Sequence, residues 1–86
     1  MGYEVLISPA ALRDLKRLRG AIRRRIAEAI DDLARDPRPH GYGKLTDSDE
    51  LYRIRVGDYR IVYQIEDDRL IVLVIRIGHR KDVYDR

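Results

Sequence analysis

Two strands joined by a two-residue turn form the feature that most restricts the fold of this 86-residue chain. Residues 51–65 read LYRIRVGDYRIVYQI, and Gly57-Asp58 separates two runs rich in β-branched and aromatic residues. Glycine accepts the positive φ that such a tight turn requires, so the segment predicts antiparallel strands at 51–56 and 59–66. The turn also sets the register, because it gives each residue of the first strand a defined partner on the second.

This register places Arg55 directly opposite Arg60, and the alternation of side chains sorts the hairpin into two faces. One face carries Tyr52, Ile54, Ile61 and Tyr63, and the other carries Arg53, Arg55 and Arg60. Like charges that lie opposite each other destabilise a sheet, whereas a phosphate neutralises them and accepts paired hydrogen bonds from guanidinium groups. We therefore interpret the three arginines as a polyanion-binding face. The alternative is a solvated surface on which the arginine stems cover apolar neighbours.

The first part of the chain predicts one strand and two helices. Residues 3–8 have the composition of a short strand, and Ser8-Pro9 combines a capping hydroxyl with proline at the first helical position. The apolar positions that follow at helical spacing are Leu12, Leu15 and Leu18. Gly20 is predicted to end this helix.

A second helix is predicted over residues 21–36, because its apolar residues form one stripe. The stripe consists of Ile22, Ile26, Ile30 and Leu33. The run Arg23-Arg24-Arg25 then lies on the solvated side of this helix. Two helices joined by about one residue must fold back on each other, and their apolar stripes need a sheet to cover.

The last strand is predicted over residues 69–77 and is apolar on both alternations, as in LIVLVIRI. Such strands are usually central, so we place it between the hairpin and the first strand, and its register leaves the face of Arg76 open. Residues 36–50 hold two prolines and two glycines and predict a loop, in which His40 faces solvent. The expected fold is α+β with the order β-α-α-β-β-β: a helical hairpin on one face of a mostly antiparallel, four-stranded sheet. One domain is expected over residues 1–86.

Composition excludes several function classes. The chain has no cysteine, so disulfides and thiolate metal sites are excluded and a reducing cytoplasm is the expected compartment. No cluster has metal-ligand spacing and no glycine-rich phosphate loop is present, so no metal or other cofactor is expected. The start lacks the pattern of a signal peptide, and the longest apolar run, residues 70–75, is far shorter than the ~20 residues that span a membrane. The net charge of +3 is compatible with a polyanionic partner.

The tail GHRKDVY supplies further candidates for the site. Gly78 is predicted to break the last strand. His79 is a candidate acid or base, or else an exposed polar residue beyond the strand end. Tyr84 is predicted to stack on a base or to order an attacking hydroxyl, or else to cover the sheet edge. Arg80 adds positive charge beside them, and Lys81, like His79, is a candidate acid or base or a substrate contact.

Residues 44–84 resemble the RelE branch of the RelE/ParE toxin superfamily, on the segments YRIRVGDYRIVYQI and IGHRKDVY found in this order. The strand and helical hairpin that precede them match the same fold. The resemblance implies a small cytoplasmic endoribonuclease that cuts messenger RNA in the ribosomal A site without a metal. The ribose 2′-hydroxyl attacks the neighbouring phosphate and leaves a 2′,3′-cyclic phosphate and a 5′-hydroxyl end.

The resemblance also implies residue roles. The basic residues of the family fall on Arg53, Arg55, Arg60 and Arg80, and its tyrosine falls on Tyr84. Arg60 and Arg80 would brace the scissile phosphate, Arg80 would assist the leaving oxygen, and Tyr84 would stack on the substrate. Some members carry lysines where this chain has Arg53 and Arg55. Arginine hardly gives up its proton, so an essential base would have to be His79 or Tyr84, unless electrostatics alone suffices.

The family implies a partner as well: a small antitoxin whose flexible segment wraps the toxin, in a complex that binds operator DNA. Two other functions remain open for the same fold. One is a ParE-type toxin that acts on gyrase without cutting RNA, although such members generally lack the full basic set and the terminal tyrosine. The other is a non-catalytic RNA-binding relic of the fold.

Overall fold

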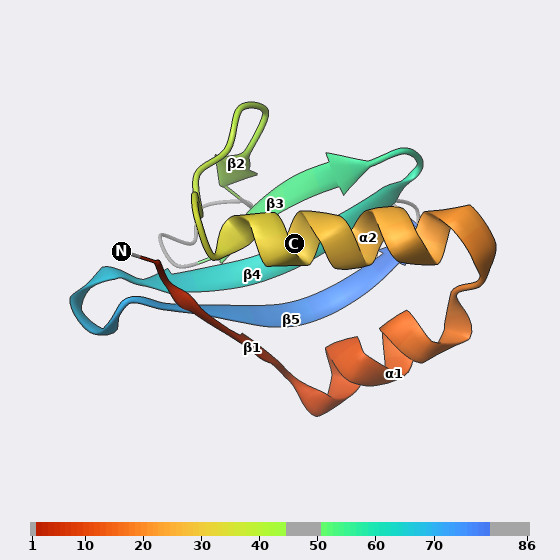
Figure 1. Ribbon diagram of the computed structural model, residues 1–86, viewed down its shortest axis with the longest axis horizontal. Helices are drawn as coiled ribbons and strands as arrows, with labels where there is room; N and C mark the ends of the chain where they lie inside the picture. The colour runs from red at the N-terminus through yellow and green to blue at the C-terminus, as the bar shows by residue number, and fades with distance from the viewer. Residues whose placement is uncertain (1, 45–50, 80–86) are drawn as a thin grey trace.

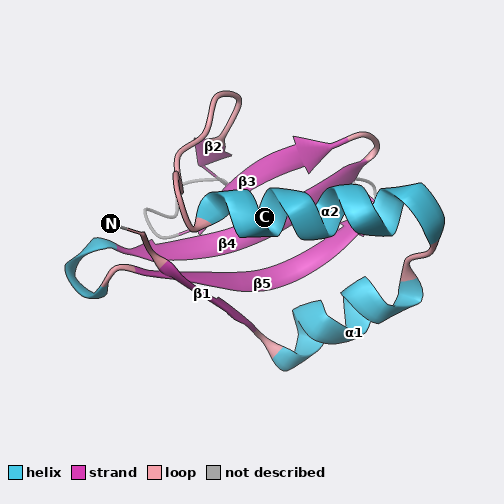
Figure 2. Ribbon diagram, in the orientation of Figure 1, coloured by secondary structure: helices cyan, strands magenta, loops and turns pink. Residues whose placement is uncertain are grey.

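The computed structural model describes residues 2–44 and 51–79. In chain order the elements are β1 (Glu4–Ile7), α1 (Pro9–Arg17), α2 (Gly20–Leu33), β2 (Gly43–Lys44), β3 (Leu51–Val56), β4 (Tyr59–Glu66), the 3₁₀ turn η1 (Asp67–Arg69) and β5 (Ile71–His79). The strands form one twisted sheet, and α2 lies across one of its faces (Figure 1). The helix α1 follows the end of β1 and packs beside β5 (Figure 2).

The sheet has five strands in the order β1-β5-β4-β3-β2. Only β1 and β5 run parallel, and the other neighbours are antiparallel. This confirms the α+β class, the mostly antiparallel sheet and the central position of the last strand. The prediction of four strands is wrong because β2 is a fifth. A strand of two residues within a loop rich in proline and glycine has no periodicity by which it can be recognised.

The start of α1 confirms the predicted cap. The Oγ of Ser8 accepts a hydrogen bond from the N–H of Ala11 at 3.0 Å, and Pro9 is the first helical residue. Of the predicted apolar stripe, Leu18 is buried in the core and Leu15 packs against it, but Leu12 is 41% exposed and Ala11 is buried instead. Neighbouring residues of a helix point in different directions, so in the nine-residue helix α1 the position next to a buried residue can face solvent.

The junction of the helices also differs from the prediction. Gly20 has a φ of 67° and begins α2, whereas α1 already ends at Arg17. The end of α2 at Leu33 comes three residues earlier than predicted. The predicted stripe is buried at Ile26, Ile30 and Leu33, and the arginines at 23–25 are exposed as expected.

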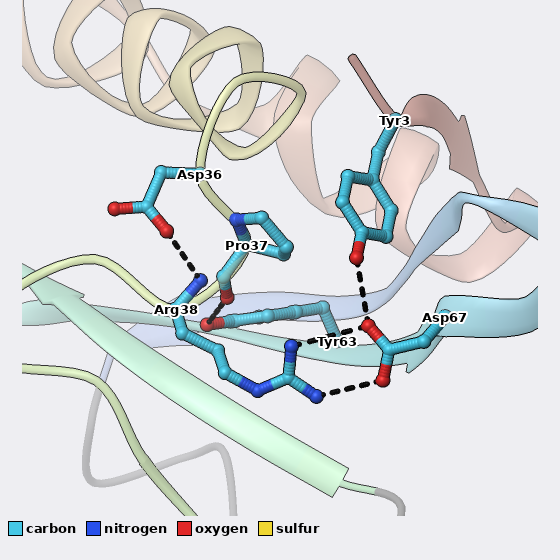
Figure 3. Close-up of polar contacts among 6 residues, drawn as sticks. All are labelled: Tyr3, Asp36, Pro37, Arg38, Tyr63 and Asp67. Atoms are coloured by element: carbon cyan, nitrogen blue, oxygen red, sulfur yellow. Dashed lines mark hydrogen bonds and ion pairs between the residues drawn. The ribbon is translucent and has the colours of Figure 1, made fainter. Parts of the chain in front are cut away.

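The core lies between the helices and one face of the sheet, which we call the helix face. Its buried side chains are Ala11, Leu18, Ile26, Ile30, Leu33, Tyr52, Ile54, Val56, Ile61, Tyr63, Val72, Val74 and Ile77. Tyr63 is fully buried, and its hydroxyl donates a hydrogen bond to the backbone oxygen of Pro37 at 2.8 Å (Figure 3). Burial is the largest effect that raises the pKa of Tyr63. Because its neutral hydroxyl is hydrogen-bonded to Pro37, the large side chain of Tyr63 can be buried in the core.

A second polar contact ties the loop after α2 to the turn between β4 and β5. Arg38 donates hydrogen bonds to both carboxylate oxygens of Asp67, at 3.2 and 2.9 Å, and the Tyr3 hydroxyl donates to the same carboxylate at 2.7 Å (Figure 3). The hydrogen bond from Arg38 and then that from Tyr3 lower the pKa of Asp67 to about 2. Arg38 also lies 5.6 Å from the ring centre of Tyr52, so its charge is used within the fold.

The edge of β5 is covered in two ways. β1 pairs with β5 only as far as Val74. Beyond that point Ser8 donates its hydroxyl hydrogen to the backbone oxygen of Ile75, and a carboxylate oxygen of Asp14 accepts from the N–H of Ile77 at 2.9 Å. The helix α1 therefore completes the ladder with side chains where β1 ends.

Asp14 also accepts a hydrogen bond from the Nε of Arg76 at 2.8 Å. Burial alone would raise the pKa of this carboxyl. The hydrogen bonds from Arg76 and from the N–H of Ile77, together with the charges of Arg76 and Arg17, outweigh burial and lower that pKa. Asp14 is thus a buried anion with matched donors, which joins α1 to the sheet.

Candidate nucleic-acid interface

The β3–β4 hairpin has the predicted register. Gly57 has a φ of 60° in the turn, and Arg55 is the direct partner of Arg60. Ile54 is the partner of Ile61, which is fully buried on the helix face. The arginines therefore lie on the opposite side of the sheet. We call this surface, which carries Arg53, Arg55 and Arg60, the arginine face.

Two rows of residues cross the arginine face. The first row consists of Arg55 on β3, Arg60 on β4 and Gly78 on β5. The second consists of Gly43 on β2, Arg53 on β3, Val62 on β4 and Arg76 on β5. Gly78 continues β5, so the prediction that it breaks the strand is wrong. A glycine can keep the extended ladder, and here it leaves the space opposite Arg60 without a side chain.

The shift in register after Val62 decides the face of Arg76. Val62 pairs with Arg76, but the next residue, Tyr63, pairs with Val74. β5 therefore holds one extra residue, Ile75, at a β-bulge. Ile75 packs against Val62 on the arginine face, while Val74 stays buried on the helix face. The sequence left the face of Arg76 open because a bulge cannot be located from alternation alone.

The arginines differ in exposure. Arg60 is 6% exposed, Arg53 is half-buried and Arg55 is exposed. Arg60 lies on β4, which has a neighbouring strand on each side. Arg60 therefore places a guanidinium group at the middle of the face.

The floor beside these charges is apolar. Val62 is buried, and Leu51 and Ile75 pack against it. A charge beside an apolar surface is screened less than one surrounded by water. Within residues 2–44 and 51–79, neither Arg53 nor Arg55 makes an ion pair. The arrangement is suited to an anionic ligand that brings its own negative charge to the sheet.

The other predicted site residues are placed as follows. His79 belongs to β5, so it does not lie beyond the strand end, and its partner across the sheet is Tyr59. The two rings meet edge to face, with centres 5.6 Å apart. Tyr59 packs against the core, so alternation puts His79 on the helix face and not among the arginines. Arg80, Lys81 and Tyr84 lie outside the described residues.

Two features of the site were not anticipated from the sequence. Gly43 lies directly beneath the guanidinium of Arg53, and Arg76 reaches from the same row to Asp14. Each of these two contacts joins residues that are distant in the sequence, so no local sequence pattern predicts it. In the described part of the chain, no group of three histidine, cysteine or acidic residues could hold a metal ion. No helix there is long and apolar enough to cross a membrane.

Comparison with known proteins identifies the family to which the chain belongs. Residues 5–84 match the family model of the ParE toxin of the type II toxin-antitoxin system parDE. The chain therefore belongs to the RelE/ParE toxin superfamily.

Individual relatives carry RelE-type names. The chain is 34% identical to Toxin RelG of Mycobacterium tuberculosis over an alignment of 87 positions that covers 100% of both proteins. It is 28% identical to the mRNA interferase toxin RelE of Escherichia coli, over 94% of this chain and 86% of that one. The crystal structure of the toxin-antitoxin complex RelBE2 from Mycobacterium tuberculosis superposes with a TM-score of 0.81 at 30% identity, covering 93% of this chain and 100% of that one. The protein is a type II toxin of the RelE family.

Proposed function

We propose that this toxin is a ribosome-dependent endoribonuclease that cleaves messenger RNA in the A site and so inhibits translation in the cytoplasm. The observation that carries the proposal is the pairing of Arg55 with Arg60 in the middle of a face whose floor is apolar. Two guanidinium groups placed opposite each other repel, and a bound phosphate would offset this repulsion. The name of the Escherichia coli relative, an mRNA interferase, supports the same activity.

The proposed reaction needs positive charge at the phosphate. The ribose 2′-oxygen forms a bond to the neighbouring phosphorus and loses its proton, while the bond from phosphorus to the 5′-oxygen breaks and that oxygen gains a proton. The products are a 2′,3′-cyclic phosphate and a 5′-hydroxyl. Negative charge grows on the phosphate oxygens in the transition state, where fixed guanidinium groups stabilise it. Arg60 and Arg80 brace the phosphate, Arg53 and Arg55 add to the field, and Arg80 assists the leaving oxygen.

Orientation of the substrate is the second requirement. Tyr84 stacks on the RNA, and Lys81 is a further substrate contact. His79 lies on the helix face, so a direct role in proton transfer would need it to turn towards the arginines. We therefore assign proton transfer to Tyr84 or to no single protein base. The ribosome then supplies much of the positioning, which is worth several orders of magnitude in rate when reacting groups are well aligned.

We also propose that a small cognate antitoxin holds the toxin inactive. The support is the solved toxin-antitoxin complex of the Mycobacterium tuberculosis relative. The proposed complex consists of one toxin domain, residues 1–86, and an antitoxin segment wrapped around it. Contact with operator DNA is made through the antitoxin. A short, acidic reading frame beside the toxin gene, whose product co-purifies with the toxin, is the expected finding.

A gyrase-directed toxin is the second candidate, because the family model that matches residues 5–84 is described by the name ParE. The basic residues favour RNA over gyrase, since they provide a surface for phosphate. A binder that grips RNA without cutting would use the same arginines, so only the products of the reaction separate these functions.

The test is primer extension on a messenger RNA in cell-free translation, with the toxin added. A sample without ribosomes and a sample with Arg60→Ala are the controls. Cuts at codon-periodic positions that are missing from both controls are expected. Cuts in the sample without ribosomes would support the nuclease activity but disprove its dependence on the ribosome. If a folded sample made no cuts, supercoiling by gyrase in the presence of the toxin would be measured next.

A further inference from the structure

We propose that Gly43 is a positioning residue for Arg53: the absence of a side chain on β2 lets the Arg53 guanidinium lie directly over this strand. The proposal rests on the proposed function, in which Arg53 contributes to RNA cleavage. It concerns a residue of the loop between α2 and β3 that the sequence does not single out.

The geometry between the two residues is close. Gly43 is the direct partner of Arg53 across the sheet, so a side chain at position 43 would point to the same face as Arg53. A Cβ atom added to Gly43 would lie 3.0 Å from Nη2 of Arg53 and 3.1 Å from both its Nη1 and its Cζ. These distances are shorter than an ordinary van der Waals contact, so any side chain at position 43 would displace the guanidinium.

The backbone does not explain the glycine. Gly20, Gly41 and Gly57 have positive φ, but Gly43 does not, so an L-residue fits its backbone. Glycine within a strand is less stable than alanine, because the unfolded chain has more freedom to lose. A strand selected only for stability would carry a larger residue here. The space that the glycine leaves is occupied by the guanidinium group of Arg53.

The position of Arg53 extends the basic surface sideways. Arg53 is anchored on β3, and its guanidinium lies over β2, at the edge of the sheet away from β4 and Arg60. The arginine face thus reaches across β2 as well as β3 and β4. Gly43 thereby determines where the outermost of these charges meets the RNA.

The experiment is a double-mutant cycle of Gly43→Ala and Arg53→Ala in the cell-free cleavage assay. Gly43→Ala is expected to lower the cleavage rate about tenfold, since small misplacements of a catalytic group have effects of this order. In the Arg53→Ala background, Gly43→Ala is expected to change the rate less than twofold. Thermal unfolding is expected to be unchanged or raised by Gly43→Ala, which separates displacement of Arg53 from damage to the fold.

Several results would overturn the proposal. Full activity of Gly43→Ala would do so, as would the same fold-loss in both backgrounds, because Gly43 would then act independently of Arg53. A fully active Arg53→Ala variant would likewise remove the group that Gly43 is said to position. Gln64→Ala, a substitution on the same face but in another row, is the matched control and should leave cleavage unchanged.

A second measurement keeps the proposal testable if the wild-type protein cleaves no RNA. The NMR signal of the Arg53 side-chain Nε–Hε group is recorded in the free toxin. Gly43→Ala should shift this signal, and Gln64→Ala should not. If Gly43→Ala shifted the Arg53 signal but the wild type cleaved no RNA, the proposed function would be wrong and the positioning of Arg53 by Gly43 would still be supported. An unshifted signal would disprove the positioning role whatever the activity.

Discussion

Arg53 and Arg76 flank the same residue, Val62, in one row across the sheet, yet they have different surroundings. Arg76 donates a hydrogen bond to the buried carboxylate of Asp14 and joins α1 to the sheet. Arg53 lies over a glycine and makes no ion pair with the described residues. Where the fold uses an arginine for its own stability, it supplies a carboxylate. Arg53 has no such carboxylate among the described residues, as the proposed contact with RNA requires.

The same contrast holds for Arg38 and Arg55. Arg38 is held by both carboxylate oxygens of Asp67, whereas Arg55 is exposed and faces another arginine. Arg38 and Arg76 are therefore arginines that the fold pairs with carboxylates, whereas Arg53 and Arg55 make no ion pair with the described residues and are the ones to which the proposed function gives the RNA. Substitutions that affect one group should leave the function of the other intact.

The largest expected effect is on cleavage. Arg60→Ala should lower the rate of RNA cleavage about 100-fold or more, because it removes a fixed charge from a transition state whose negative charge grows. Arg76→Ala removes an arginine from the same face and serves as the matched control. It should retain cleavage within about threefold per folded molecule. If the two variants lost cleavage equally, the division into two groups of arginines would be wrong.

The next effect is on stability. Asp14→Ala removes the acceptor of the Ile77 N–H and the partner of Arg76, and Asp14 is only 9% exposed. The free energy of unfolding should fall by about 1–3 kcal/mol, the usual cost of leaving buried polar groups unsatisfied. Urea denaturation measures this fall. Cleavage per folded molecule should remain at the wild-type level.

The stabilisation by Asp14 should also depend on pH. Its pKa is lower in the folded protein than in the unfolded chain, so the contribution is fully present above the unfolded pKa. It is lost as the pH falls through the folded pKa. The difference in unfolding free energy between the wild type and Asp14→Ala should therefore shrink as the solution becomes more acid. A constant difference down to low pH would contradict this account.

Lysine replacements sharpen the comparison within the arginine face. If Arg53 and Arg55 act only through their charge, Arg53→Lys and Arg55→Lys should retain cleavage within about fivefold, far above the level of Arg60→Ala. A loss approaching that of Arg60→Ala would mean that the planar guanidinium, with its paired donors, is required. The rate of cleavage in the cell-free assay, with thermal unfolding as the control for folding, decides between these outcomes.

The smallest effect is expected at Asp67, whose carboxylate is exposed. Its pKa of about 2 lies below the ordinary value of 3.8, so its contribution to stability is fully present above about pH 4 and is lost as the pH falls through about 2. Asp67→Asn should lower the thermal midpoint slightly at neutral pH, and this difference should shrink towards zero as the pH falls through about 2. The matched control is Asp68→Asn in the same turn. It should have a smaller effect at neutral pH, because it leaves the contacts of Arg38 and Tyr3 intact.

Much of the fold was predictable because it follows from local rules. The turn at Gly57 set the hairpin register, and Ser8 with Pro9 marked the start of the first helix. The two-sided apolar pattern of the last strand identified it as central. These signals work because each lies within a few neighbouring residues, whose spacing alone determines which atoms can meet.

Three of the errors have the same physical origin. β2 was missed, the end of β5 was displaced, and the side of His79 was not anticipated. Each depends on pairing between strands. β2 forms because Gly43 pairs with Arg53 on β3. β5 continues through Gly78 because this glycine pairs with Arg60 on β4.

The sequence by itself determined that this chain has an α+β fold with a hairpin whose arginines share one face, because alternation and turn chemistry are properties of adjacent residues. Only the tertiary structure decided which arginines are neutralised. Asp14 and Arg76 are 62 residues apart and meet because α1 covers the edge that β1 leaves open. Gly43 and Arg53 meet because a two-residue strand pairs there. The sequence gives the number of arginines, and the packing of distant segments decides which of them meet a carboxylate.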